Sequence, residues 1–235
     1  MCIRDSRKTQ LEENLEATRA EINRLSAQSD RMPPELLPVT KFHPAADIAL
    51  LAELGVTDVA ENREQEARAK ASELPQLRFH MIGQIQTKKA NHVARWAASV
   101  HSVDSLKLAR ALERGVSLAK ERGEREGNLS VFIQVSADGD GTRGGVIPSA
   151  LSELVDAVEG AEHLDLAGLM VVPPLDADAG EVFRGVRQEA DRLSAEVNRP
   201  LKMSAGMSAD MAEAIAAGSD IVRVGTSIMG PRPVG

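Results

Sequence analysis

"LKMSAGMSADMAEAIAAGSDIVRVG", residues 201–225, contains two short apolar runs with one amphipathic segment between them. The runs 201–204 and 221–225 predict strands, and Ala209–Ala217 predicts a helix because its apolar residues recur at helical spacing. A strand, a helix and a second strand in this order predict two parallel strands joined by a crossover. The rest of the fold can be worked out from this unit.

The same alternation runs back through the chain. The other strand-like runs are LLPVT (36–40), TDVA (57–60), RFHMI (78–82), SVHSV (99–103), VFIQVS (131–136) and LDLAGLMVV (164–172). Helix-like stretches lie between them at Ala45–Leu54, Arg63–Glu73, Ser105–Arg122, Ala150–Val158 and Glu181–Val197, and an opening helix carries Leu11, Leu15, Ile22 and Leu25 on one face. Eight strands alternating with helices predict a single (β/α)8 TIM barrel with an extra N-terminal helix. A doubly wound open sheet is the alternative.

Composition limits the classes of protein that the chain can belong to. A net charge of −7 argues against nucleic acid or an anionic membrane as the main partner. No apolar run approaches the roughly 20 residues that a membrane helix needs. The one cysteine, Cys2, excludes an internal disulfide and favours a cytoplasmic location.

The first six residues, "MCIRDS", do not resemble the rest of the opening helix. Read back into codons, they resemble an adapter used in preparing sequencing libraries. We therefore interpret residues 1–6 as a non-native N-terminal scar and residues 7–235 as one domain.

Polar residues follow the predicted strands. In a barrel, the carboxyl ends of the strands form the active face, so these residues should converge. They are Lys41, Glu61-Asn62, Gly83-Gln84, Asp104, Ser136, Met170, residues 204–208 and residues 223–226.

Residues after the last two predicted strands have the pattern of a phosphate site. Ser208 is placed to cap the helix that follows, and Arg223, Gly225 and Thr226 end the last strand. Barrels often bind phosphate between the loops after their seventh and eighth strands. Alone, Ser208 reads as a cap and Lys41 as the exit of a strand into solvent. Together they suggest a lysine beside a phosphate.

A lysine beside a phosphate site suggests a Schiff base with a phosphorylated aldehyde. The amine must be neutral to react, and burial lowers the pKa of a lysine. Two ligand classes fit: a phosphorylated sugar in an aldolase, or pyridoxal phosphate (PLP).

Three further features have structural interpretations. "GDGTRG", residues 139–144, matches a dinucleotide fingerprint, but no helix opens directly at its glycines, so we expect a mobile loop over the barrel mouth. His80 and His101 lie within strands and are expected to be packed and hydrogen-bonded. The pair Lys88-Lys89 is expected at a solvated helix start.

The chain also resembles the pyridoxal phosphate homeostasis proteins, which are single-domain relatives of the barrel of alanine racemase. The motifs that carry the resemblance are "LLPVTKFHP", "ENREQE", "FHMIGQIQTKKAN", "HSVDS", "GLMVVPP" and "MSAGMSADMAEAIAAGSDIVRVGTSIMGPR". The resemblance implies that Lys41 holds PLP as a Schiff base. It also implies that Ser208, Gly225 and Thr226 bind the phosphate with Ser204, that Arg223 faces the pyridine nitrogen, and that Asn62 and Met207 line the ring.

The function implied by this resemblance is PLP binding in vitamin B6 and amino-acid homeostasis, without strong catalysis. PLP-dependent apoenzymes would be the recipients, and a monomer is expected. The alternatives are a fold-type III PLP enzyme such as an amino-acid racemase, and a cofactor-free Schiff-base aldolase. The chain has no tyrosine and stops shortly after its last predicted strand, so we expect it to lack the second base of a racemase.

Overall fold

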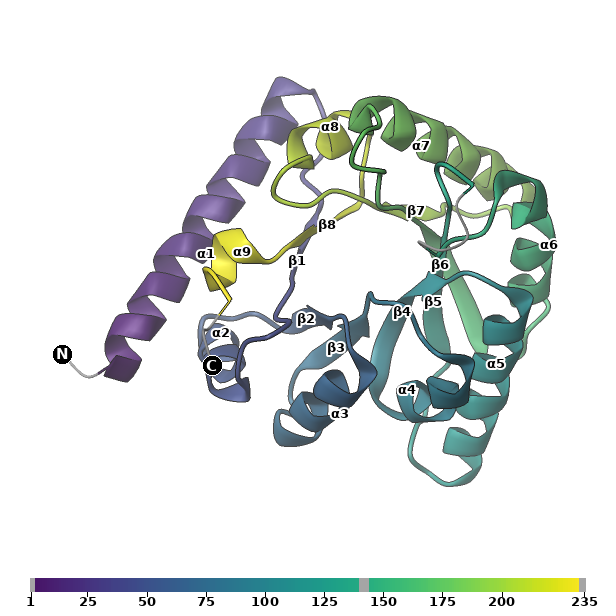
Figure 1. Ribbon diagram of the computed structural model, residues 1–235, viewed down its shortest axis with the longest axis horizontal. Helices are drawn as coiled ribbons and strands as arrows, with labels where there is room; N and C mark the ends of the chain where they lie inside the picture. Colours follow the sequence, from purple (N-terminus) through teal and green to yellow (C-terminus); the bar gives the residue numbers. More distant parts are fainter. Residues whose placement is uncertain (1–2, 140–143, 233–235) are drawn as a thin grey trace.

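Parallel strands form the inner wall of the protein, and helices surround them (Figure 1). The computed structural model describes residues 3–139 and 144–232. Eight strands lie in this part of the chain: β1 (Glu35–Pro38), β2 (Asp58–Glu61), β3 (Arg78–Met81), β4 (Ala97–Val103), β5 (Leu129–Gln134), β6 (Leu164–Met170), β7 (Lys202–Ser204) and β8 (Ile221–Val224). Each pairs in parallel with the next strand in sequence from β2 to β8, and β8 pairs with β1. A bridge between Val39 and Ala60 joins β1 to β2, so the predicted barrel is confirmed.

Most of the helices also follow the prediction. The helices are α1 (Ile3–Gln28), α2 (Ala45–Glu53), α3 (Glu64–Glu73), α4 (Ala90–Trp96), α5 (Leu106–Glu121), α6 (Pro148–Glu159), α7 (Ala179–Glu196), α8 (Met211–Ala216) and α9 (Thr226–Met229). The helix start expected at Lys88-Lys89 is a 3-10 turn, η1 (Thr87–Lys89), that leads into α4. Two short helices, α4 and α9, were not predicted as elements.

The extra N-terminal helix packs along the outside of the barrel, against α2, α8 and α9 (Figure 1). Leu11, Leu15, Ile22 and Leu25 are all buried, as their spacing predicts. Burying a leucine contributes about 1.5–3 kcal/mol, so this stripe is enough to hold the helix in place. The helix begins at Ile3, and Arg4 forms an ion pair with Glu53 of α2.

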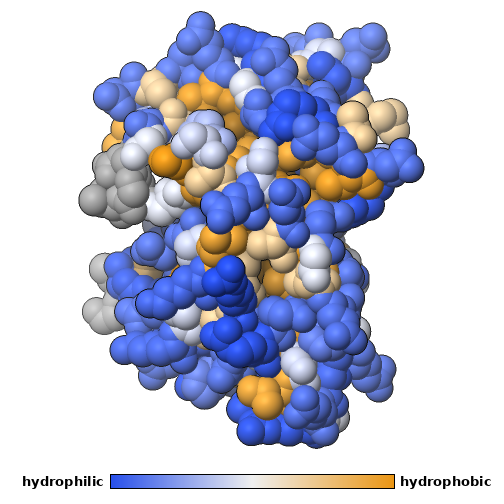
Figure 2. Space-filling model, turned by 90° about the vertical axis from the view of Figure 1, so that its right-hand side faces the viewer, coloured by the Kyte–Doolittle hydropathy of each residue, from blue (hydrophilic) through white to orange (hydrophobic). Residues whose placement is uncertain are grey.

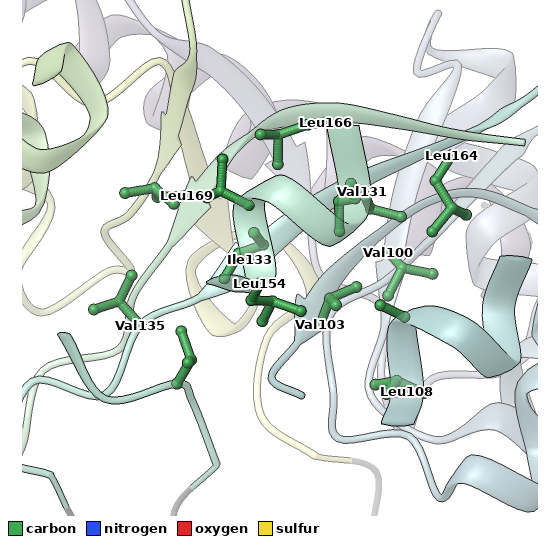
Figure 3. Close-up of a cluster of buried hydrophobic side chains, with 14 of the residues drawn as sticks. Val100, Val103, Leu108, Val131, Ile133, Val135, Leu154, Leu164, Leu166 and Leu169 are labelled. Atoms are coloured by element: carbon green, nitrogen blue, oxygen red, sulfur yellow. The ribbon is translucent and has the colours of Figure 1, made fainter. Parts of the chain in front are cut away.

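The largest core lies between the strands and the outer helices. Val131 and Ile133 of β5 point into it with the leucines of β6 and α6 (Figure 3). Phe132, between them in sequence, points into the barrel instead and packs with Leu37 and Met170. This alternation is the strand period of two, and it lets β5 contribute side chains to both sides of the barrel wall.

The outer face is solvated. Figure 2 shows hydrophilic residues over most of one side of the molecule, with hydrophobic residues in separate patches between them. Within the described ranges, no helix is long and apolar enough to cross a membrane.

Candidate functional site

A cavity of about 550 Å³ opens at the carboxyl ends of the barrel strands. All of the predicted site residues except Ser204 line it: Lys41, Asn62, Met207, Ser208, Arg223, Gly225 and Thr226. Arg232 also lines the cavity, and among the described residues that line it none is acidic. Basic side chains around a hollow make its potential positive, so the cavity favours an anionic ligand.

Lys41 lies in the turn that follows β1. It is half-buried rather than enclosed in the strand, because β1 already ends at Pro38. The next residue, Phe42, has a left-handed backbone with φ of 69°, which is uncommon for a residue other than glycine. The carboxylate of Glu66 accepts the Phe42 N–H at 2.8 Å and stabilises this conformation. The turn therefore fixes the backbone from which the lysine side chain reaches the cavity.

A buried ion-pair cluster supports this turn from below. The ammonium group of Lys70, in α3, donates to Glu61 at 2.7 Å, to Glu66 at 2.6 Å and to the carbonyl oxygen of Thr40 at 3.0 Å. The Thr40 hydroxyl also donates to Glu61, at 2.6 Å. Burial raises the pKa of Glu61, and the bonds from Lys70 and Thr40 oppose that rise. Both backbone neighbours of Lys41 are thus tied to one charged cluster.

The loop between β7 and α8 brings Met207 and Ser208 to the cavity. Gly206 has φ of 96°, and a Cβ at this position would lie 2.6 Å from the Cβ of Ala214, so the loop needs glycine here. The expectation that Ser208 caps the helix is wrong. The helix begins at Met211 and its N-cap is Asp210, because a turn intervenes in which the Asp210 carboxylate accepts the Met207 N–H at 2.6 Å.

The loop after β8 brings Gly225 and Thr226 to the same cavity. Gly225 is the residue before α9, and Thr226 is the first residue of that helix. The Ser208 hydroxyl lies 3.0 Å from the Ser227 hydroxyl, which links the two loops. Two hydroxyl residues, Ser208 and Thr226, therefore line one cavity together with Gly225, and such donors suit a phosphate group.

Arg223 lies deeper, with only 3% of its surface exposed. Its guanidinium donates to the Ser204 hydroxyl at 2.7 Å and to the carbonyl oxygen of Val171 at 3.0 Å. Burial lowers the pKa of Arg223 to about 10, so the group is still a cation at neutral pH. Ser204 is not part of the cavity wall, and its hydroxyl lies behind Arg223 instead.

Other predicted features lie around this site. His80 and His101 are buried, and both nitrogens of each ring are hydrogen-bonded, as predicted. Lys89 forms an ion pair with Glu64 at 3.4 Å. Residues 140–143 of the glycine loop lie outside the described residues, but Gly144 lines a second cavity of about 210 Å³ beside the site. In residues 3–139 and 144–232, no cluster of side chains could hold a metal ion.

Sequence reasoning missed Lys70 and the backbone role of Glu66. The spacing of these two residues, four apart on a polar helix, is typical of a solvent-exposed ion pair. Only the packing of α3 beneath the Lys41 turn shows that they are buried, so no signal in the sequence pointed to them.

Comparison with known proteins identifies the class. Residues 14–233 match the family described as "Alanine racemase, N-terminal domain". A curated pyridoxal phosphate homeostasis protein of Corynebacterium glutamicum is 57% identical over 200 residues, covering 85% of this chain and 90% of the relative. The chain therefore belongs to the pyridoxal phosphate homeostasis protein family.

Solved structures agree with this assignment. PipY of Synechococcus elongatus, solved with PLP bound, is 32% identical, with a TM-score of 0.79 over 94% of this chain and 100% of PipY. The crystal structure of an unknown protein from Bifidobacterium adolescentis has a TM-score of 0.86 at 28% identity, over 95% of this chain and 96% of its own.

Proposed function

We propose that this protein binds PLP in the cavity at the barrel mouth and serves vitamin B6 and amino-acid homeostasis. The observation that carries the proposal is that Lys41, Arg223 and the hydroxyl pair Ser208 and Thr226 line one cavity of about 550 Å³. PLP, when bound, supplies a reactive aldehyde, an electron-withdrawing ring and a phosphate. The cavity offers an amine, a cation and hydroxyl donors to match these three groups.

The residues divide between the parts of the cofactor. Lys41 attaches to the aldehyde as a Schiff base, and Ser208, Gly225 and Thr226 bind the phosphate. Asn62 and Met207 line the ring. The proposal assigns Arg223 to the ring nitrogen and Ser204, through its hydrogen bond, to the orientation of Arg223.

We propose further that the protein holds PLP without strong catalysis and releases it to apoenzymes. Arg223 keeps its proton at neutral pH and so leaves the ring nitrogen unprotonated. An unprotonated ring withdraws electrons less strongly, which makes the cofactor a weak electron sink. The chain has no tyrosine to act as a base on the second face of a substrate. Action as a monomer in the cytoplasm is part of the same proposal.

The proposal can be tested by the colour of the protein. Purified chain incubated with PLP should absorb in the visible range, and borohydride followed by peptide mapping should find the label on Lys41. The Lys41→Ala variant should lose this label. As a matched control, Lys89→Ala removes a cation that is paired with Glu64, and it should keep the label. A label on Lys88, Lys89 or Lys202 would contradict the assignment, and a colourless chain that cleaves a sugar phosphate would favour an aldolase.

A further inference from the structure

Hydrogen bonds inside the barrel connect Asp58, near the amino end of β2, to Arg223, at the cavity. His80 Nε2 lies 2.7 Å from Asp58 Oδ1, and His80 Nδ1 lies 2.7 Å from Ser99 Oγ. His101 Nε2 lies 2.9 Å from the same Ser99 oxygen. His101 Nδ1 lies 2.9 Å from the Oγ of Ser204, the residue that accepts from Arg223. We call these six residues, Asp58, His80, Ser99, His101, Ser204 and Arg223, the relay.

The chemistry of the two ends gives the relay a direction. A guanidinium can only donate hydrogen bonds, so Arg223 donates to Ser204. At the other end, burial alone would raise the pKa of Asp58, but hydrogen bonds from His80 and Thr57 outweigh it and hold that pKa below its ordinary value. Asp58 is therefore a carboxylate, which can only accept.

The residues between the ends must follow this direction. Each serine hydroxyl has one proton, and Ser204 already accepts from Arg223, so it is free to donate to His101 Nδ1. His101 then carries its proton on Nε2 and donates to Ser99, and Ser99 donates to His80 Nδ1. His80 in turn donates from Nε2 to Asp58. With both histidines neutral, this is the arrangement that makes every one of the contacts a hydrogen bond.

Packing holds the central ring in this orientation. The His101 imidazole stacks on Phe132 with ring centres 4.3 Å apart and an angle of 28° between the planes. It also meets the His80 ring edge-on at 5.7 Å. The pKa of His101 lies well below its ordinary value, first because the ring is buried and then because His80 and Arg223 are near, so the ring stays neutral.

We propose that the relay is a one-way hydrogen-bond chain that orients the guanidinium of Arg223 and connects its charge to the carboxylate of Asp58. Ser204, His101, Ser99 and His80 are then positioning residues, and none of the four lines the cavity. The direction of the relay follows from the described contacts once Asp58 is ionised and both rings are neutral, and it does not depend on the proposed function. Its effect on the cofactor rests on the proposed function, because that proposal puts Arg223 at the ring nitrogen.

The direction can be tested by nitrogen NMR of the full chain labelled at histidine, without PLP and at neutral pH. His80→Gln and His101→Gln assign the two signals. In each ring, Nε2 should carry a proton and Nδ1 should carry none. A proton on Nδ1 of either ring, or a cationic ring, would overturn the relay.

The effect on the cofactor can be tested with two variants of one residue. His101→Gln keeps an acceptor and a donor in the same order, whereas His101→Phe keeps the stacking ring but removes both. His101→Phe should shift the absorption maximum of bound PLP and weaken PLP binding roughly three- to tenfold, the effect of losing one hydrogen bond, while His101→Gln should change neither.

A second break in the relay keeps the test decisive if His101→Phe does not fold. Ser99→Ala should shift the absorption maximum in the same direction. Ser26→Ala, which removes a buried hydroxyl in α1 that donates to Ile22, should leave the absorption unchanged. If breaking the relay at both residues leaves spectrum and affinity unaltered, the positioning role is wrong. A chain that binds no PLP would refute the proposed function, while the nitrogen spectra would still decide the relay.

Discussion

The ammonium group of Lys70 lies 3.0 Å from the carbonyl oxygen of Thr40, the residue immediately before Lys41. With only 7% of its side chain exposed, Lys70 pairs with the carboxylates of Glu61 and Glu66. Its contact with Thr40 also holds the turn that carries the proposed PLP lysine. The cluster thus joins the stability of the fold to the placement of a functional side chain.

Replacing Lys70 by methionine should therefore destabilise the protein. The change leaves Glu61 and Glu66 without their cation, and breaking one side of a buried pair typically costs about 3–5 kcal/mol. Urea unfolding of the variant and of the wild type measures the difference. Lys8→Met is the matched control, since it breaks an exposed pair with Glu53 and should cost no more than about 1 kcal/mol. Equal losses of unfolding free energy in the two variants would mean that the buried Lys70 cluster contributes no more to stability than the exposed pair.

The two hydroxyl groups at the cavity should each contribute to cofactor affinity. Ser208→Ala and Thr226→Val should each weaken PLP binding by about 1.5–3 kcal/mol, the value of a hydrogen bond to a charged group. Free phosphate should compete with PLP. Ser227→Ala removes only the hydroxyl behind Ser208 and should have a smaller effect. Unchanged affinity in the double variant, measured by fluorescence titration, would place the phosphate elsewhere.

The buried neutral His101 should make stability depend on pH. Its folded pKa is well below the ordinary value of 6.5, so below pH 6.5 the unfolded chain takes up a proton that the folded chain does not. The free energy of unfolding should therefore fall as pH falls, by up to about 1.4 kcal/mol per unit for this one group. Burial lowers the pKa of His43 as well, so the wild-type slope contains both residues.

Subtracting a variant isolates the contribution of His101. His101→Gln cannot take up this proton in either state, so its stability should fall less steeply between pH 6.5 and 5.5 than that of the wild type. Urea unfolding at several pH values gives both slopes. Parallel curves would show that the buried ring does take up a proton in the folded protein.

The protein should not exchange the α-proton of an amino acid at enzymatic rates. Racemisation needs a base on each face, and a cationic Arg223 would give the ring no proton to strengthen its electron sink. The protein, PLP and L-alanine incubated in deuterated water should give only slow α-deuteration and no build-up of D-alanine, as followed by NMR. Fast exchange with D-alanine formation would make the protein an enzyme.

Much of the barrel could be predicted because its strands are apolar and regularly spaced. Even β7, which is only three residues long, is recognisable, since a glycine turn and a helix follow it. A helix start was predicted at Lys88-Lys89, but α4 itself was not predicted as an element, because its seven residues are too few for a clear helical period. Periodicity identifies long elements, and short ones depend on tertiary packing.

Part of the site could be predicted because the carboxyl ends of parallel strands lie at one face of a barrel. That rule brings Lys41 and Thr226 to one cavity. It does not say which side chains meet across the barrel interior, so neither the bond from Arg223 to Ser204 nor the pairing of Lys70 with Glu61 could be read from sequence. Both depend on depth within the barrel and on side-chain direction, which residue order alone does not specify.

The bridge between Val39 and Ala60 has a consequence for motion. Strands β1 and β8 share four residue pairs, whereas within the described residues this single bridge joins β1 to β2, supported by the Thr40 N–H, which donates to Ala60 at 3.0 Å. Local opening of the barrel should therefore cost less at this seam than between β1 and β8. Lys41 follows β1 and Asn62 follows β2, so a ligand that contacts both residues stabilises the closed pairing of these two strands. At a concentration of 100 times its Kd, such a ligand raises the free energy of opening by about 2.7 kcal/mol, and the amide hydrogen of Thr40 then exchanges with solvent about a hundredfold more slowly.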